Sequence, residues 1–320
     1  MNDSVVRDLL VGDSKPMREL RARIVCVAAS RLPVLVQGPT GSGKELVARA
    51  IHRASKRRGE FIPFNVAAVG ESLFESMVFG HVKGAFSGAI DSLPGYLAES
   101  HGGTCFMDEI GTLPLGLQCK LLRALDQGEY RPIGARRDQR SDFRLVAATN
   151  ESIPSLVEGG RFRPDLAFRI SGFVIDVPPL SHRADDIPIL VDHFAPQISA
   201  AHGIPCVFLP AALRMLQQMP WFGNVRELQH VVTRAALFAD ESPIGVETMR
   251  RVLDVERPHA AGGGCVDLDE CERLRRVLEA SGWNVTRAAR TLALHPVTVY
   301  RRMKRLGIVR PRKDPPTKCA

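Results

Sequence analysis

The sequence predicts an α/β protein in which helices cover a parallel sheet and further helical segments follow. Between residues 11 and 179, short apolar runs rich in Val, Phe and Ile alternate with amphipathic segments. Strand–helix alternation of this kind implies a parallel sheet packed between helices. From residue 180 to about residue 254 the pattern becomes helical. The 320 residues are 45% hydrophobic and 24% charged, which allows a substantial core and more than one domain.

Five apolar runs bounded by Gly, Pro or acidic residues are predicted as strands. They are residues 33–37 (PVLVQ), 61–65 (FIPFN), 104–108 (TCFMD), 143–149 (FRLVAAT) and 172–177 (GFVIDV). Amphipathic helices are predicted at residues 46–52, 118–125, 187–195, 210–219 and 225–238. We therefore expect an N-terminal segment at residues 1–10, an α/β subdomain at 11–179 and a helical subdomain at 180–254.

The charge of the chain is concentrated near its C-terminus. Residues 284–320 hold ten Lys and Arg against one acidic residue, Asp314, in a chain of net charge +8. A basic segment on a near-neutral body suggests a nucleic-acid partner, and a solvated basic tail is the alternative. Residues 255–265 are rich in Gly and lack periodicity, so they are predicted as a flexible linker. Residues 266–320 then form a separate small helical domain.

Several classes of protein are disfavoured by what the sequence lacks. The seven cysteines include no CxxC spacing and the nine histidines no HExxH spacing, so neither a disulfide framework nor a zinc site is expected. No apolar run reaches the ~18 residues that a membrane helix needs. The first residues are acidic and interrupted by charge, unlike a signal peptide. We expect a cytoplasmic protein without a membrane partner.

A phosphate-binding loop is predicted after the first strand, at the segment GPTGSGKE. Its glycines let backbone N–H groups turn toward phosphate, Lys44 reaches the β- and γ-phosphates, and the next helix adds its N-terminal dipole. The usual pattern has Ser or Thr after the lysine, where this chain has Glu45. A chance Gly-rich turn is the alternative. The predicted nucleotide-binding residues of this loop are Gly38, Pro39, Thr40, Gly41, Ser42, Gly43, Lys44 and Glu45.

Two carboxylates follow the apolar strand at residues 104–108. Asp108 is suited to hold Mg²⁺ through water, and Glu109 is suited to polarise an attacking water. A solvated surface pair is the alternative. Thr149 and Asn150 end the strand at residues 143–149 and are predicted to orient the same water.

Seven motifs lie in one order between residues 11 and 254: GPTGSGKE, FMDEIGTLPLGLQCKLLRAL, ATN, GRFRPDLAFRI, VPPL, DDIPIL and WFGNVREL. In order and spacing they resemble the AAA+ domain of bacterial enhancer-binding proteins, the NtrC-type activators of sigma-54 RNA polymerase. The resemblance implies a P-loop ATPase with a helical lid that binds ATP and Mg²⁺. In that family Glu45 after the lysine is usual.

The resemblance also assigns roles to four further residues. Asn65 would hold Glu109 as a switch that senses the nucleotide. Arg163 and Arg169 would be fingers that reach the γ-phosphate bound by a neighbouring subunit, and Arg226 would be the lid arginine that contacts the nucleotide. From the residues alone, ordinary surface salt bridges are the alternative for these arginines.

The segment GAFSGA places Phe86 among residues too small to form an apolar face around it. In the family that the chain resembles, a GAFTGA loop at this place rises toward the pore of a ring and touches sigma-54. The implied contact residues are Gly84, Ala85, Phe86, Ser87, Gly88 and Ala89. Ser87 replaces a threonine and removes one methyl group, worth about 0.8 kcal/mol if buried. An ordinary exposed loop is the alternative. Residues 128–142 correspond to a second pore loop.

The pattern of the basic C-terminal segment predicts two short helices separated by a turn at residues 293–295. A basic second helix after such a turn is typical of helix-turn-helix DNA binding, and the segment resembles a Fis-type domain. His295 and Pro296 replace the Ser-Arg or Asn-Arg pair that is frequent there, which leaves the target sequence open. The predicted DNA-binding residues are Thr298, Tyr300, Arg301, Arg302, Lys304 and Arg305.

These patterns predict an ATP-hydrolysing transcription activator. It would bind enhancer DNA, form a ring, expected to be a hexamer, and remodel the closed complex of sigma-54 RNA polymerase holoenzyme. Since the phosphate loop begins near residue 38, we expect no receiver domain before it. Control is then expected from abundance, from a regulatory protein in trans, or from nothing at all. The alternative is a DNA-binding regulator, such as a repressor, that acts on other sigma factors and uses the ATPase fold for assembly. An unfoldase or clamp loader would leave the helix-turn-helix unexplained.

Overall fold

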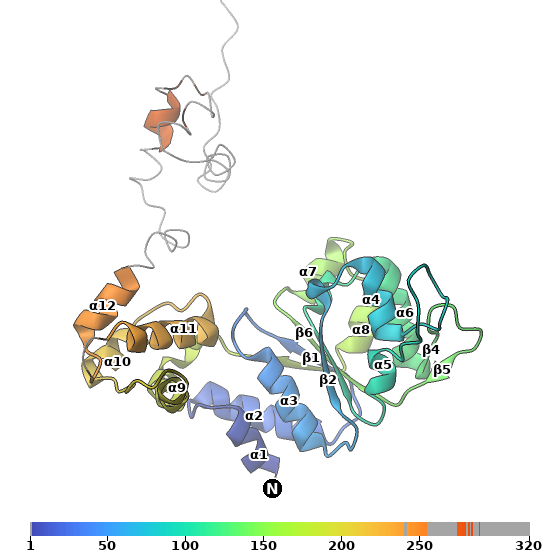
Figure 1. The fold of residues 1–320 in the computed structure, drawn as a ribbon, viewed down its shortest axis with the longest axis horizontal. Coiled ribbons are helices and arrows are strands. Elements are labelled where there is room, and N and C mark those ends of the chain that lie inside the picture. Colours follow the sequence, from blue (N-terminus) through green and yellow to red (C-terminus); the bar gives the residue numbers. More distant parts are fainter. Residues whose placement is uncertain are drawn as a thin grey trace, which may run out of the picture. The chain divides into compact units, whose positions relative to one another are not determined.

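The computed structural model of the chain describes residues 2–239, 242–254, 274–279, 281, 283 and 288. The chain divides into two compact units, residues 1–254 and residues 255–320, which we describe separately. In the first unit, a sheet covered by helices adjoins a group of helices formed by residues 180–254 (Figure 1).

A five-stranded parallel sheet organises the first unit. Its order is β2-β3-β6-β1-β7, and every pairing in it is parallel. The strands are β1 (Val34–Gln37), β2 (Phe61–Asn65), β3 (Thr104–Asp108), β6 (Arg144–Thr149) and β7 (Phe173–Asp176). All five predicted strands are confirmed. Because the strands are parallel, the residues that follow them meet at one edge of the sheet.

Helices bury both faces of this sheet. Val34 and Val36 of β1 pack in the core shared with α1, α2 and α3, whereas Leu35 faces the opposite core. Successive strand residues point to opposite faces, so a strand buried on both sides becomes a continuous apolar run. The helices on the first face are α1 (Asn2–Leu9), α2 (Lys15–Ala28) and α3 (Lys44–Ser55); those on the second are α4 (Glu71–Phe79), α5 (Tyr96–Glu99), α6 (Leu115–Gln127), α7 (Ile153–Glu158) and α8 (Pro164–Ile170).

Short elements connect these helices and strands. They are the 3-10 helices η1 (Val66–Ala68) and η2 (Ile110–Thr112), and the antiparallel hairpin of β4 (Glu129–Tyr130) and β5 (Gln139–Arg140). The N-terminal segment, for which the sequence pattern predicted no element, contains helix α1. Its Val6 is fully buried, and α1 packs against α3 and α2.

A helical subdomain, which we call the lid, follows the sheet. It consists of η3 (Leu180–Asp186), α9 (Ile187–His202), α10 (Pro210–Gln217), α11 (Asn224–Leu237) and α12 (Val246–Asp254). Its core includes Leu190 and Phe194 of α9 and Leu228 of α11. Trp221 is buried there and donates its indole N–H to Leu216 O at 2.8 Å.

In the second unit, residues 274–279 are helical, and Leu274, Leu278 and Ala288 are buried. The predicted helix-turn-helix residues from Thr298 to Arg305 lie outside the described residues. Within the part of the chain that the structure describes, no helix is both long enough and apolar enough to cross a membrane.

Candidate nucleotide site and partner loop

The phosphate loop joins β1 to α3 at the carboxyl edge of the sheet. Gly38 N–H donates to Thr149 O at 3.2 Å, which ties the start of the loop to β6. Gly41 and Gly43 have φ values of +76° and +104°, in the left-handed region where a glycine is favoured. Helix α3 begins at Lys44 immediately afterwards. The loop therefore has the strand–loop–helix setting that the sequence predicts for phosphate binding.

Lys44 lies folded over the loop and is only 9% exposed. Its Nζ donates to Gly38 O at 3.0 Å and to Pro39 O at 3.3 Å. Burial lowers the pKa of Lys44, the nearby charges of Asp108 and Glu109 raise it, and Arg226 lowers it further. Predicted site residues from two distant segments, Asp108 and Glu109 on one and Arg226 on the other, thus act electrostatically on Lys44. The structure brings them together around the phosphate loop.

The acidic pair lies at the end of β3. Asp108 and Glu109 are both half-buried, and Glu109 N–H donates to Asp108 Oδ1 at 3.0 Å. Asn65 pairs in register with Asp108 on the neighbouring strand. Its carboxamide oxygen accepts hydrogen bonds from Ala67 N and Ala68 N at 2.9 and 3.2 Å. The switch role of Asn65 toward Glu109 stays a prediction.

The two residues at the end of β6 differ in their surroundings. Thr149 is buried, and its hydroxyl exchanges hydrogen bonds with the backbone of Glu151. Asn150 is exposed and donates to the hydroxyl of Thr40 in the phosphate loop at 3.3 Å. Asn150 is thus directed toward the loop, whereas the Thr149 hydroxyl is already engaged.

A largely apolar pocket opens beside the phosphate loop, and the sequence pattern did not predict it. Four parts of the chain form its walls: the segment around α1 and α2, the end of the phosphate loop with the start of α3, Val177 after β7, and the lid. The lining residues include Leu9, Val11, Val47, Leu190, Phe194 and Val225, together with Ser42, Gly43 and Arg183. The Ser42 hydroxyl and Arg183 Nε are buried without a hydrogen-bond partner among the described residues. No local signal marks this pocket because its walls are far apart in the sequence.

The GAFSGA loop is a closed turn. Gly84 N–H donates to Ala89 O at 2.9 Å and Ala89 N–H donates to Phe86 O at 3.0 Å. Phe86 is 43% exposed and packs edge-on against His81, with ring centroids 5.1 Å apart. The sequence pattern left Phe86 without an apolar face, and the structure supports one side of it with this ring. Ser87 is exposed, whereas Ala89 is 7% exposed; the contact roles of all six residues stay predictions.

The second predicted pore loop, residues 128–142, is tied to the base of the GAFSGA loop. Val82 N–H donates to Ile133 O at 3.1 Å, and Ile133 N–H donates to Gly80 O at 2.9 Å. A Cβ atom at Gly134 would lie 2.8 Å from the Ala85 Cβ, so the two loops approach closely. They form one connected element rather than two independent tips.

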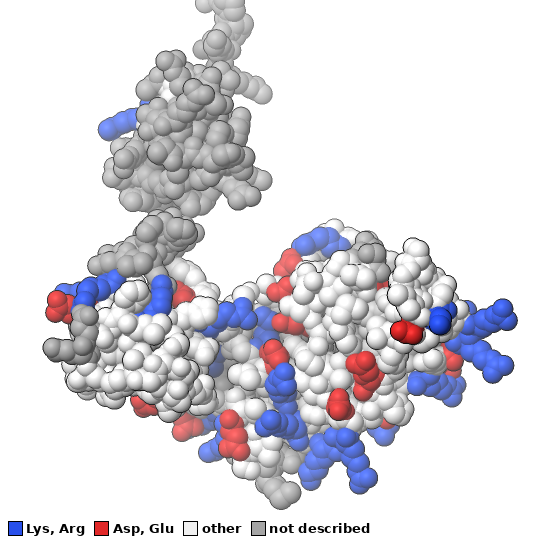
Figure 2. Space-filling model, viewed as in Figure 1, with Lys and Arg blue, Asp and Glu red and all other residues white. Residues whose placement is uncertain are grey.

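A surface rich in Lys and Arg, which the sequence pattern did not predict, lies on this second loop. Figure 2 shows Lys and Arg side chains gathered where β4 and β5 lie in Figure 1. Asp138 pairs with Arg123 and Arg131, and Glu129 pairs with Arg140. Arg136 and Arg137 are exposed as well.

The two predicted finger arginines lie on or beside α8, and each pairs with a carboxylate of its own chain. Arg163 contacts both oxygens of Asp165, with Nε–Oδ1 and Nη2–Oδ2 distances of 3.0 and 2.6 Å. Arg169 pairs with Asp126 at 2.9 Å and donates to Leu125 O at 2.7 Å. Both side chains are more than 40% exposed. Their role toward a neighbouring subunit stays a prediction.

Comparison with known families fits this geometry. The family model described as "Sigma-54 interaction domain" matches residues 10–176. The chain belongs to the sigma-54 interaction domain family. The model "AAA+ ATPase lid domain" matches residues 181–263, and "Bacterial regulatory protein, Fis family" matches residues 269–306. The predicted α/β AAA+ fold with a helical lid and a Fis-type helix-turn-helix is confirmed.

Similar proteins extend the likeness over most of the chain. The anaerobic nitric oxide reductase transcription regulator NorR of Klebsiella pneumoniae (strain 342) is 41% identical over 94% of this chain and 62% of its own length. The regulatory protein LuxO of Vibrio cholerae is 41% identical over 93% of this chain and 61% of its own length. The chain thus spans somewhat more than three-fifths of these two relatives.

A solved structure is similar as well. NtrX from Brucella abortus in complex with ADP is 30% identical, covers 93% of this chain and 69% of its own, and has a TM-score of 0.70. The same protein in complex with ATP gives a TM-score of 0.69 and 31% identity. The domain boundaries that we predicted from the sequence stay predictions.

Proposed function

We propose that this protein is an ATP-hydrolysing activator that remodels the closed complex of sigma-54 RNA polymerase holoenzyme. The observation that carries the proposal is the partly exposed Phe86 on a closed turn, in a chain that belongs to the sigma-54 interaction domain family. An apolar side chain presented on a short loop fits a contact with another protein. The turn belongs to the same compact unit as the phosphate loop.

The nucleotide we propose is ATP. The phosphate loop and Lys44, which lies over it, fit the phosphates of ATP, and the apolar pocket fits its base. The Ser42 hydroxyl and Arg183 Nε, buried without partners among the described residues, leave polar groups for a ligand to satisfy. NtrX, a similar protein, forms complexes with ADP and with ATP.

The half-buried Asp108 offers the oxygen ligands that Mg²⁺ prefers, so it would hold the ion through water. The ion would neutralise charge on the phosphates. Glu109 would accept the proton of the attacking water, and Asn150 would help to orient that water. Arg226 would contact the nucleotide from the lid, while Arg163 and Arg169 would complete the site of the next subunit in a ring, for which we propose six subunits.

Enhancer DNA is the second proposed partner. The match of residues 269–306 to the Fis family and the basic character of residues 284–320 support it.

For the domains we propose a segment at 1–10, an α/β subdomain at 11–179, the lid at 180–254, a linker at 255–265 and the DNA-binding domain at 266–320. We propose that a regulatory protein in trans, or abundance, controls activity.

Open-complex formation with purified polymerase tests the proposed function. We expect the protein and ATP to open a promoter with polymerase carrying sigma-54, and not with polymerase carrying another sigma factor. ATP hydrolysis without opening in the sigma-54 reaction, combined with an effect on the other polymerase, would favour the alternative regulator. A Lys44→Ala variant supplies the background without nucleotide binding.

A further inference from the structure

The lid holds the phosphate loop through three consecutive backbone carbonyls. Asn224 Nδ2 donates to Thr40 O at 3.0 Å. The N–H of Val225 donates to Gly41 O at 3.0 Å. Arg183 Nη2 donates to Ser42 O at 2.9 Å. Each donor comes from the lid, more than 130 residues along the chain from its acceptor.

This junction is closely packed. Asn224 is 2% exposed and Arg183 is 4% exposed. A Cβ atom at Gly41 would lie 2.2 Å from Gly223 O, so the loop backbone and the lid backbone are in contact there. Asn224 Oδ1 also accepts from Leu180 N–H at 2.9 Å. One carboxamide thus bridges the phosphate loop and the first residue of the lid.

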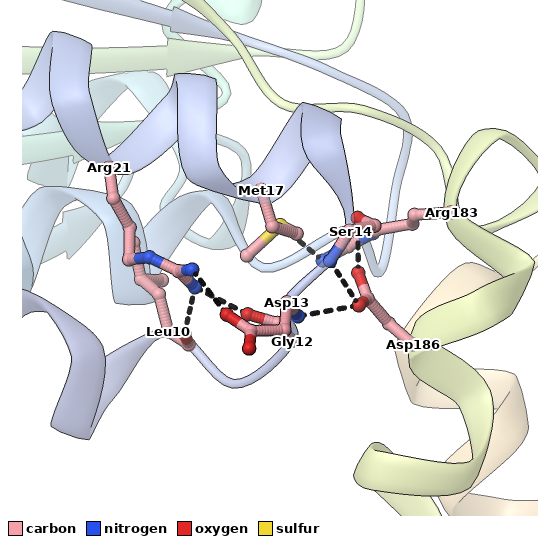
Figure 3. Close-up of polar contacts among 8 residues, drawn as sticks. All are labelled: Leu10, Gly12, Asp13, Ser14, Met17, Arg21, Arg183 and Asp186. Atoms are coloured by element: carbon pink, nitrogen blue, oxygen red, sulfur yellow. Dashed lines mark hydrogen bonds and ion pairs between the residues drawn. The ribbon is translucent and has the colours of Figure 1, made fainter.

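The guanidinium of Arg183 is fixed from two sides, and Figure 3 shows the side that contacts Met17. Its Nη1 contacts Met17 Sδ at 2.9 Å while Nη2 contacts the loop. Three residues later, the Asp186 carboxylate accepts from Asp13 N–H and Ser14 N–H at 2.6 and 2.8 Å. Asp186 is 1% exposed. The segment that carries Arg183 is therefore anchored to the turn before α2, which leaves Arg183 little freedom.

The direction of a carbonyl fixes the direction of the next amide. In a planar trans peptide, the C=O of one residue and the N–H of the following residue point in opposite directions. Holding Thr40 O and Ser42 O toward the lid therefore turns the N–H groups of Gly41 and Gly43 away from it. The held Gly41 O orients Ser42 N–H, which donates to Pro39 O at 3.3 Å. The N–H groups of Gly41 and Gly43 are the amides that a phosphate loop offers to its anion.

We propose that Asn224 and Arg183 are positioning residues for nucleotide phosphates, which they serve by holding the carbonyls of the phosphate loop. This inference rests on the proposed nucleotide site. Since the donors belong to the lid, phosphate affinity and lid position are linked: phosphates favour the docked lid, and displacement of the lid weakens the phosphate contacts. Such linkage is reciprocal.

Two substitutions of Asn224 separate its contacts. Asn224→Asp retains an oxygen to accept from Leu180 N–H and removes the donor to Thr40 O and to Phe222 O. Asn224→Ala removes all three contacts without adding charge. Asn and Asp are the side chains best tolerated at the left-handed φ of 54° found here. We expect both variants of the full chain to bind ADP about tenfold more weakly, the loss expected for a buried carbonyl that loses its donor.

Binding of adenosine, measured by competition, reports the base pocket alone. We expect its dissociation constant to stay within about twofold of wild type in both variants, because Asn224 is not among the residues that line the pocket. Ser199→Ala is the matched control. It removes a lid hydrogen bond, from Cys206 N–H at 3.2 Å, that does not involve the loop, and it should leave ADP affinity unchanged.

Two results would overturn the inference: wild-type ADP affinity in Asn224→Asp, or equal losses of ADP and adenosine affinity in Asn224→Ala. Arg183→Met provides an independent test, because it removes the donor to Ser42 O. It should weaken ADP binding in 0.5 M salt as well as in low salt, since salt does not screen the loss of loop orientation. Failure of the wild-type chain to bind ADP above the Lys44→Ala background would instead refute the proposed nucleotide site.

Discussion

Glu109 adopts a backbone conformation that is uncommon for its residue type. Its φ of 56° and ψ of 42° lie in the left-handed region, and it is followed at once by η2. Thr112 stabilises this turn by donating its N–H and its hydroxyl to Glu109 O at 3.0 and 2.8 Å. Strained conformations of this kind are found at functional sites, where the surrounding structure fixes them. The turn places the Glu109 carboxylate where its charge raises the pKa of Lys44.

Substitution of the two charged residues should separate binding from hydrolysis. Lys44→Ala should abolish ATP binding because the phosphates lose their cation. Glu109→Gln should still bind ATP but hydrolyse it about 10²–10⁴-fold more slowly, because the attacking water loses its proton acceptor. Equilibrium binding and phosphate release measure the two activities. Wild-type hydrolysis by Glu109→Gln would refute the role given to this carboxylate.

The cysteines should differ sharply in reactivity. Cys26 and Cys119 are exposed, whereas Cys105 on β3 is fully buried. Burial raises the pKa of Cys105 to about 12, so its thiol stays protonated and unreactive near pH 8. Iodoacetamide followed by peptide mass spectrometry should find Cys26 and Cys119 modified and Cys105 modified only after unfolding. Equal labelling of Cys105 in the folded protein would contradict the buried position of β3.

Among the elements, the sheet was the most predictable part. Its strands are buried on both faces, so each is an apolar run bounded by polar residues, and the residues after them form the site by topology alone. The sequence did not predict α1, whose pattern is short and charged. Nor did it predict the lid contacts: Arg183 and Ser42 are 141 residues apart, and only packing of the lid brings them together.

A substitution in the GAFSGA loop should separate sigma-54 binding from ATP hydrolysis. Phe86→Ala removes an aromatic ring that contacts His81 and solvent, so ATP hydrolysis should persist while sigma-54 binding is lost. Retention of sigma-54 in the presence of ADP–aluminium fluoride is the measurement. Retention by Phe86→Ala equal to wild type would show that the ring is not the contact.

Ser87 offers a finer test at the same tip. Ser87→Thr adds a methyl group and retains the hydroxyl, so it should retain sigma-54 at least as well as wild type. Ser87→Val retains the bulk and removes the hydroxyl, and the comparison shows whether packing or hydrogen bonding matters at this position. One buried methyl is worth about 0.8 kcal/mol, or roughly fourfold in affinity.

At the scale of the whole molecule, the arginine pairs bear on assembly. In the single chain Arg163 is engaged by Asp165 and Arg169 by Asp126. Exposed pairs of this kind contribute little free energy, so a neighbouring phosphate can compete for both arginines. We expect ATPase activity per subunit to rise with protein concentration, as in enzymes where a finger in trans adds about 10³–10⁵ in rate.

Arg163→Ala or Arg169→Ala should flatten that rise. Mixing Arg169→Ala with Lys44→Ala should restore part of the activity, because one subunit supplies the arginine and the other the intact phosphate loop. Steady-state phosphate release over a range of mixing ratios measures this. Absence of rescue at every ratio would indicate a site completed within one chain.

Removal of the proposed DNA-binding domain should leave the first unit intact. Deleting residues 266–320 should abolish specific DNA binding and retain ATP hydrolysis, since the phosphate loop, the acidic pair and the lid all belong to residues 1–254. In the full chain, Arg302→Ala should weaken binding to all DNA sequences alike and lower the salt slope by about 0.9, as expected for one lost phosphate contact. A loss restricted to one DNA sequence would instead mean that Arg302 reads a base.

The position of β2 at one edge of the sheet has a consequence for solubility. Glu60 O accepts from Thr104 N–H of β3. Backbone groups of alternate residues along β2, Pro63 among them, therefore point away from β3 toward the free edge of the sheet. Pro63 is exposed at the middle of that edge and has no N–H to donate. A strand from another copy therefore finds an interrupted ladder there. Copies crowded together can meet through their side-chain surfaces while this edge resists the strand pairing that leads to aggregation.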